Sequence, residues 1–339
     1  MAAYSLPLTF RPNRQAVVAL WLAFLAGLVG ADLWFSQGGT VSLPEAVIAV
    51  GPTPLPLVEG VNPSDIALPA APDAALEENA AEGRLPVIGA DGRMPLAVYG
   101  YPFDRDDPRP RVSIVLTGVG LETAALAKSI ERLPGAVGLA FSVFTPDLAG
   151  ALSRARTAGH ETLLAVAADG RDPLAFDPGP GAIRSALSAD ENMQRLRLMM
   201  GQSTGYVGLV IDPQTTVLDN ANMAGALLSE SQKRGLAIVA MNPEFARMGA
   251  AQGSPIVNAV AVIDPLAPPE AIDTVLVELE QRARESGMAL VLAPSYPVVV
   301  DRLAHWLPGL SGRGVALAPA SALVPLPAPQ AAPEQGSTH

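Results

Sequence analysis

Short apolar runs alternate with amphipathic segments over the last two thirds of the chain. The runs are rich in Val, Ile, Leu and Ala at nearly every position, and they lie at 112–117, 137–143, 161–167, 206–211, 236–241, 257–263, 288–293 and 315–319. Continuous apolar runs of this length are typical of parallel strands that are covered on both faces. The pattern therefore predicts a parallel sheet that is buried from both sides.

The segments between these runs carry the start and stop signals of helices. Thr145, followed by proline, predicts an N-cap, and Gly159 predicts the end of the same helix. Ser188 stands three residues before a glutamate, which is the pattern of a capping box. Two more helices are expected over about 222–234 and 268–286, because each stretch is followed by a glycine.

Seven or eight strand–helix units follow one another over residues 111–324. Strand–helix alternation implies parallel strands with crossover helices. This number of units favours a distorted (β/α) barrel over an open doubly wound sheet. In either fold, a ligand site is expected at the carboxyl ends of the strands.

A different pattern stands at the N-terminus, where residues 16–36 are apolar except for Asp32. About 20 apolar residues span the ~30 Å hydrocarbon core of a bilayer. Because Arg11 and Arg14 precede this stretch, we expect a transmembrane helix with residues 1–15 in the cytoplasm. The rest of the chain would then face the periplasm from the inner (cytoplasmic) membrane, with membrane lipid as a partner of 16–36. The alternatives are a cleaved signal peptide, which would release the body to the periplasm, and a buried core helix.

The next segment, 37–84, is rich in Pro, Ala and acidic residues, and we expect it to be a disordered linker. Residues 85–110 contain Tyr99, Tyr101 and Phe103 and are predicted to pack on the barrel as an N-terminal arm. The tail, 325–339, repeats the Pro/Ala pattern and is expected to be disordered.

Charge and composition narrow the range of functions. The 339 residues carry a net charge of −11. Of this charge, −7 lies on residues 37–110, which contain eleven acidic residues and four arginines. An acidic chain of this kind argues against nucleic acid as a partner. The absence of cysteine excludes disulfides, thiolate metal sites and a thiol nucleophile, and three histidines leave little room for a site built from imidazoles.

Acidic residues follow several of the predicted strands. Asp169, Asp212 and Asp264 are candidate catalytic residues, because strand-end carboxylates can share a cation through oxygen ligands or act as an acid–base pair. The alternative is that these carboxylates cap helices or face water. His160 precedes its strand, where an imidazole more often satisfies backbone carbonyls at a helix end than takes part in chemistry. The Walker and HExxH motifs are not present.

Several segments, in order, resemble the divergent polysaccharide deacetylases over about residues 95–322. They include VSIVLTGVGL, LPGAVGLAFSVFTPDL, AGHETLLAVAADG, DPGPGAIRSALSADENMQRL and PSYPVVVDRLAHWLPGLSGRGVALAPASAL. The resemblance implies a distorted β/α barrel, an exported envelope protein, and metal-assisted removal of acyl groups from glycans. A divalent metal such as zinc would be the family's cofactor, since it polarises the carbonyl and ionises its bound water.

The positions that the resemblance assigns to metal ligands mostly hold other residues. Thr117 and Gly118 stand in place of an Asp pair, Asp212 in place of a His, Ala240 and Met241 in place of Asp-Ser, and Pro294 in place of a late His. Only His160, Asp169 and Tyr296 keep the character of the family. The sequence therefore predicts no resident metal and no cofactor.

These observations favour the hypothesis that the protein is a membrane-anchored, catalytically degenerate member of the family that binds a glycan or an envelope protein. Its substrate cleft would be formed by the strand-end residues Thr117, Phe144, Asn242, Glu244, Ser295 and Tyr296. One alternative is an active metal-dependent deacetylase with a site rebuilt from Asp169, Asp212 and Asp264. The other is an envelope scaffold that acts through its acidic linker.

Overall fold

The computed structural model describes residues 66–172 and 177–325. The chain divides into two compact units, Met1–Pro54 and Leu55–His339, and every described residue belongs to the second. The expected segments 1–15 and 16–36, the linker as far as residue 65, and the tail from residue 326 lie outside the described residues. Among the helices that are described, none is long and apolar enough to cross a membrane.

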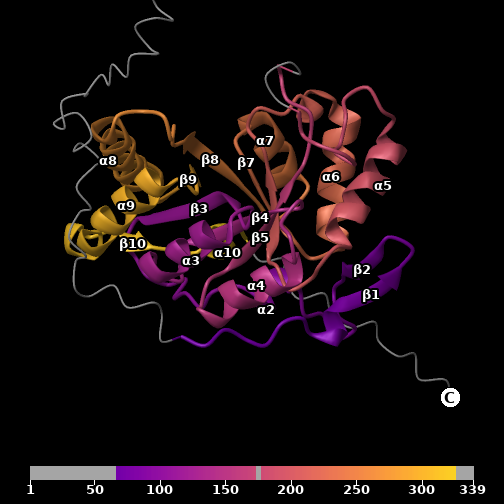
Figure 1. Cartoon of the computed structure of the whole chain (residues 1–339), viewed down its shortest axis with the longest axis horizontal. Helices are drawn as coiled ribbons and strands as arrows, with labels where there is room; N and C mark the ends of the chain where they lie inside the picture. Colours follow the sequence, from indigo (N-terminus) through magenta and orange to yellow (C-terminus); the bar gives the residue numbers. More distant parts are fainter. Residues whose placement is uncertain (1–65, 173–176, 326–339) are drawn as a thin grey trace, which may run out of the picture. The chain divides into compact units, whose positions relative to one another are not determined.

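Seven parallel strands form a closed barrel, and they pair in the order in which they occur along the chain (Figure 1). The first and last strands close it, since Arg111–Thr117 pair in register with Met288–Pro294. The strands are β3 (Arg111–Val119), β4 (Gly138–Ser142), β5 (Thr162–Val166), β6 (Gly208–Ile211), β7 (Ala237–Ala240), β8 (Ile256–Val262) and β9 (Met288–Pro294).

A short eighth strand, β10 (Ala316–Leu317), pairs with the first residues of β3, where β4 does not reach. Each of the eight predicted apolar runs overlaps one of these strands. The expected (β/α) barrel is confirmed.

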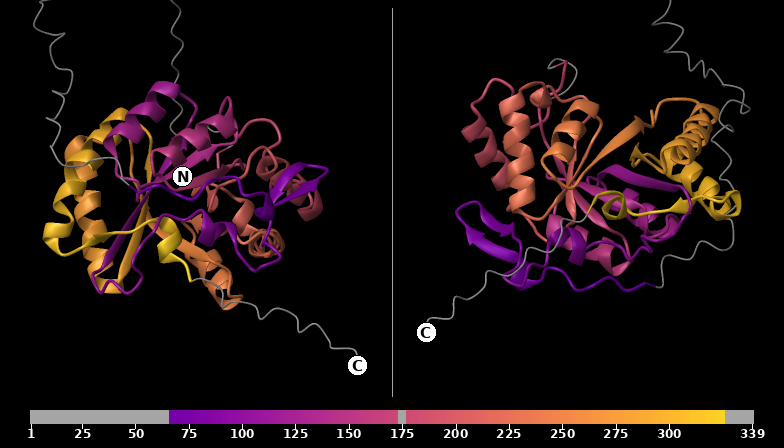
Figure 2. Two further views of the ribbon diagram at one scale, coloured as in Figure 1. Left: turned by 90° about the horizontal axis from the view of Figure 1, so that it is seen from below. Right: turned by 180° about the vertical axis from the view of Figure 1, so that it is seen from behind.

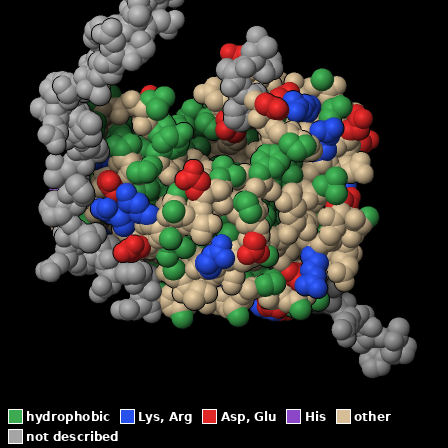
Figure 3. All heavy atoms as spheres, in the orientation of Figure 1, with side chains coloured by type: hydrophobic (Ala, Val, Ile, Leu, Met, Phe, Trp, Pro, Cys, Tyr) green, Lys and Arg blue, Asp and Glu red, His purple; other side chains and the backbone are tan. Residues whose placement is uncertain are grey.

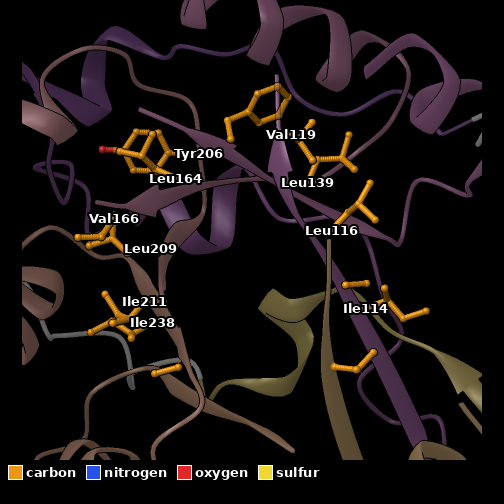
Figure 4. Close-up of a cluster of buried hydrophobic side chains, with 14 of the residues drawn as sticks. Ile114, Leu116, Val119, Leu139, Leu164, Val166, Tyr206, Leu209, Ile211 and Ile238 are labelled. Carbon is orange, nitrogen blue, oxygen red and sulfur yellow. The ribbon is translucent and has the colours of Figure 1, made fainter. Parts of the chain in front are cut away.

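Both faces of the barrel strands are buried, which explains why the apolar runs do not alternate with polar residues. On β3, Ile114 and Leu116 belong to the large cluster between the barrel and its helices (Figure 4). Val115, between them, belongs to a second cluster together with Leu163 of β5 and Val210 of β6. This second cluster fills the barrel interior.

Helices surround the barrel (Figures 1 and 2). They are α3 (Thr123–Arg132), α4 (Leu148–Thr157), α5 (Ala189–Met200), α6 (Ala221–Lys233), α7 (Pro243–Ala251), α8 (Pro269–Ser286) and α9 (Pro297–Trp306). The capping box of Ser188 at the start of α5 is present. Glycines in the left-handed conformation follow α6 and α8 at Gly235 and Gly287, as expected.

The predicted start of α4 is wrong. The N-cap is Asp147, whose Oδ1 accepts a hydrogen bond from the amide of Gly150 at 3.1 Å. Asp147 has a φ of 49°, which is unusual for a residue other than glycine. Thr145 is buried instead, and its hydroxyl donates to the carbonyl of Val119.

Order begins before the predicted end of the linker at residue 84. The 3-10 helix η2 (Ala74–Leu76) leads into a hairpin of β1 (Glu77–Ala80) and β2 (Gly83–Pro86). Arg234, after α6, holds this hairpin: it donates to Glu78 and to the carbonyl of Pro86 while also pairing with Glu230. The linker prediction was wrong for these residues because amino-acid composition cannot reveal hydrogen bonds to a residue as distant in sequence as Arg234.

The amino-terminal end of the barrel, which we call the floor, is closed by residues from both ends of the described chain. The helices α2 (Pro95–Val98) and α10 (Ala320–Leu323) lie here, and Leu96, Tyr99 and Leu323 join the interior cluster. The floor is therefore a packed plug.

Candidate functional site

A cavity of about 780 Å³ opens at the carboxyl ends of the barrel strands. We call this cavity the bowl. Its wall consists mainly of apolar side chains from the strand ends and the loops that follow them, including Leu121, Val143, Phe144, Val166, Pro178, Val210, Met241, Val262, Leu292 and Pro294. This is the end at which (β/α) barrels bind ligands.

Two of these apolar side chains, Leu121 and Phe144, are large and exposed, at 53% and 43% of their surface. Hydrophobic side chains gather at the upper part of the molecule in the view of Figure 3, around the ends of β7 and β8. The bowl therefore has an apolar wall and an apolar rim.

The polar groups of the bowl are few. They are the hydroxyls of Thr117 and Ser142, the amide of Gln214, and the carboxylates of Asp177 and Asp212. Lysine, arginine and histidine do not occur among the described residues that line it. The bowl thus offers hydrogen-bond acceptors and negative charge on an apolar surface.

Asp212 follows the buried end of β6, so the strand places its carboxylate at the wall of the bowl. Its Oδ1 accepts a hydrogen bond from the amide of Gln214 at 2.7 Å, which closes a local turn. Within the described part of the chain, Asp212 forms no ion pair. Its second oxygen is therefore available to a ligand.

Asp177 contributes less charge to the bowl. It is exposed, accepts from the amide of Gly179, and lies 3.5 Å from the guanidinium of Arg184. Exposed ion pairs of this kind contribute little energy, but they offset the local charge.

The three candidate catalytic carboxylates do not form one site. Asp169 accepts hydrogen bonds from the amide and hydroxyl of Ser185, both at 2.7 Å, and from the hydroxyl of Thr216. It therefore ties two loops together and does not line the bowl. Asp264 is exposed and closes a turn by accepting from the amide of Leu266. Only Asp212 lies in the bowl.

Of the six predicted cleft residues, Thr117 and Phe144 line the bowl. The other four are not among the residues that line it: Asn242 caps α7, Glu244 lies in the first turn of α7, the hydroxyl of Ser295 donates to the carbonyl of Gly118, and Tyr296 is the half-exposed residue before α9. Sequence reasoning overlooked Ser142, Asp177 and Gln214. Asp177 opens one of the quoted segments, and Ser142 lies near the end of the apolar run 137–143, so both had a signal in the sequence.

His160 lies at the opposite end of the barrel, fully buried just before β5. Its Nδ1 donates to the carbonyl of Val137 at 3.1 Å. Burial lowers the pKa of this imidazole, so the neutral form is favoured. The structural role expected for His160 is confirmed.

The bowl also brings together the positions at which the family would carry metal ligands. Thr117, Gly118, Asp212, Met241 and Pro294 all line it. Glycine and proline side chains offer no ligand atom, and a thioether is a poor ligand for a hard or borderline cation. Over residues 66–172 and 177–325, no group of three His, Cys, Asp or Glu side chains is placed to hold a metal ion. These residues do not fit a catalytic zinc.

The fold and the bowl define a (β/α) barrel with a cavity at the carboxyl ends of its strands. Residues 114–324 match the divergent polysaccharide deacetylase family, and the chain belongs to that family.

The solved structures include two similar chains. An uncharacterized protein of Agrobacterium tumefaciens C58 is 28% identical, with a TM-score of 0.66, over 71% of this chain and all of the other. A putative cellobiose-phosphate cleavage protein of Enterococcus faecalis V583 is 13% identical, with a TM-score of 0.48, over 64% of this chain and all of the other. No curated protein matches the chain.

Proposed function

We infer that this protein is a carbohydrate-binding member of its family that does not hydrolyse its ligand. One observation carries this proposal: the cavity is present, but the expected metal ligands are not. Four of the five ligand positions on its wall are occupied by Thr117, Gly118, Met241 and Pro294. A metal-dependent hydrolase needs a cation to ionise its attacking water, and these side chains do not hold one. The cavity remains suitable for binding.

The chemistry of the bowl matches a sugar ligand. The apolar face of a sugar ring can pack on the Val, Leu and Met side chains of the wall. Sugar hydroxyls can donate to the carboxylate of Asp212 and exchange hydrogen bonds with Thr117, Ser142 and Gln214. At about 780 Å³, the cavity lies within the range of small-ligand sites.

The first experiment separates binding from hydrolysis. The purified full-length chain is incubated with an N-acetylglucosamine tetramer and zinc, and acetate release and binding are both measured. We expect binding without release of acetate above the metal-only blank. Zinc-dependent release of acetate at enzymatic rates would overturn the proposal.

A matched pair of variants locates the binding site. Ala165→Leu adds three carbons to the wall of the bowl, whereas Ala250→Leu makes the same change on the exposed face of α7. We expect Ala165→Leu to weaken binding of the tetramer at least tenfold and Ala250→Leu to leave it unchanged. Equal affinities would show that the bowl is not the site.

The body is further proposed to lie in the periplasm, held by residues 16–36. The chain has no cysteine, so single cysteines can report on topology. The native Leu266 side chain is 85% exposed. In cells with a permeabilised outer membrane, a membrane-impermeant maleimide should therefore label the Leu266→Cys variant. It should label Ser5→Cys only after lysis. Labelling of Ser5→Cys before lysis would reject a cytoplasmic N-terminus, and loss of that residue from the mature protein would indicate a cleaved signal peptide.

A further inference from the structure

We propose that the bowl selects a ligand carrying a protonated amine, which the carboxylate of Asp212 receives. This proposal rests on the proposed function, because it names the chemistry of the ligand that the same cavity binds. It would make the protein a receptor for amino sugars in preference to their N-acetylated counterparts.

The charge of the bowl is the first step of the argument. Asp212 is a carboxylate on a mainly apolar wall, and its side chain has no cationic partner in the part of the chain that the structure describes. The carboxylate of Asp177 is exposed and shares its charge with Arg184. Asp212 is therefore the negative charge of the bowl that is left uncompensated.

The second step concerns water. A ligand that fills the apolar cavity removes water from the carboxylate of Asp212, and an ionised carboxylate loses much free energy when it is desolvated without a partner. A hydroxyl group replaces one hydrogen bond but no charge. An ammonium group supplies both, and hydrogen bonds between two charged groups are the stronger ones.

The third step concerns geometry. The Oδ1 of Asp212 is held by the amide of Gln214, so the side chain is already oriented before a ligand binds. Its second oxygen accepts no hydrogen bond from the described residues. A preorganised acceptor loses little conformational entropy on binding.

The chain supplies a matched control for this carboxylate. Asp264 follows β8 and accepts from an amide two residues later at 2.9 Å, as Asp212 does after β6. Asp264 is exposed and lies outside the bowl. Replacing either Asp by Asn keeps the acceptor of the turn and removes one negative charge, so the two variants differ only in where the charge is lost.

The experiment uses the full-length chain in detergent micelles, with a glucosamine tetramer and an N-acetylglucosamine tetramer as probes. Titration calorimetry measures both affinities for the native protein, for Asp212→Asn and for Asp264→Asn. The acidic segment 37–110 attracts any cationic probe, and because both variants keep it, the comparison between them cancels its contribution.

We expect the native protein to bind the glucosamine tetramer about tenfold or more tightly than the N-acetylated tetramer. Asp212→Asn should remove this preference and Asp264→Asn should keep it. Equal affinities for the two tetramers, or a preference that survives Asp212→Asn, would overturn the amine proposal while the carbohydrate-binding proposal stands. Absence of binding by either tetramer would overturn both.

Discussion

Carboxylates at the two ends of the barrel differ in how many hydrogen bonds they accept from the rest of the protein. At the floor, Glu161 is completely buried, and its carboxylate accepts from the amide of Tyr101 and from the amide and hydroxyl of Ser321. At the bowl, the carboxylate of Asp212 accepts one hydrogen bond, from the amide of Gln214, and has no further partner among the described residues. Polar groups at the floor join distant segments of the chain, whereas the carboxylate of Asp212 at the bowl is bonded only within its own loop among the described residues.

Arg156 and Arg105 complete the floor. Arg156 donates to the carbonyls of Tyr99 and Pro69, both at 2.9 Å. Arg105 donates to carbonyls at the end of α10, including those of Ser321 and Val324. These bonds join the arm to α4 and α10, so the floor is stabilised by distant segments of the chain.

The sharpest test of this contrast is to remove the carboxylate of the floor. Glu161→Ala should lower the free energy of unfolding by about 3 kcal/mol or more, because it leaves buried donors of Tyr101 and Ser321 without an acceptor. Urea denaturation measures the change. A loss below about 1 kcal/mol would mean that the floor is no more dependent on its polar groups than the bowl.

The next effect concerns the hairpin. Arg234→Met should cost about 2 kcal/mol and raise hydrogen exchange in β1 and β2, because Arg234 is buried and bonds to Glu78, Glu230 and the carbonyl of Pro86. The control is Arg84→Met, whose exposed side chain lies 3.6 Å from Glu77 and should change stability by less than about 0.5 kcal/mol. Equal losses would show that the hairpin is not held by Arg234.

Acid should weaken the same region. Burial alone would raise the pKa of Glu230, but hydrogen bonds from Arg197 and Arg234 lower it to about 2. A lowered pKa in the folded state stabilises the protein at pH values above the ordinary carboxyl range, and this contribution is lost as the pH falls toward 2. Its size is about 2 kcal/mol after allowance for solvent screening. Glu230→Gln should flatten the dependence of unfolding on pH below about 4.5, and an unchanged slope would refute this assignment.

The smallest effect is expected at the bowl. Asp212→Asn should change the free energy of unfolding by no more than about 0.5 kcal/mol, since the turn keeps its acceptor and no ion pair is broken. Thermal and urea unfolding provide the measurement. A loss comparable to that of Glu161→Ala would make Asp212 a structural residue and would remove the difference between the two ends.

The sequence predicted the barrel well because its strands depend on local apolar runs such as 112–117 and 288–293. It failed where distant residues decide the structure. The hairpin at 77–86 is held by Arg234, about 150 positions away, and Asp147 caps α4 from a left-handed conformation that no local pattern indicates. The site was predicted in part for the same reason. Thr117 lies near the end of β3, and Phe144 and Asp212 closely follow β4 and β6, so all three were found. Asp177 reaches the bowl from a long loop.

The floor also fixes where the body can be attached to other things. The carbonyl of Pro69, near the first described residue, is bonded to Arg156, and the carbonyl of Val324, near the last, is bonded to Arg105. Both ends of the described chain therefore leave the barrel on the side opposite the bowl. A group attached to residue 66 or residue 325 would therefore lie on the side of the barrel opposite the cavity.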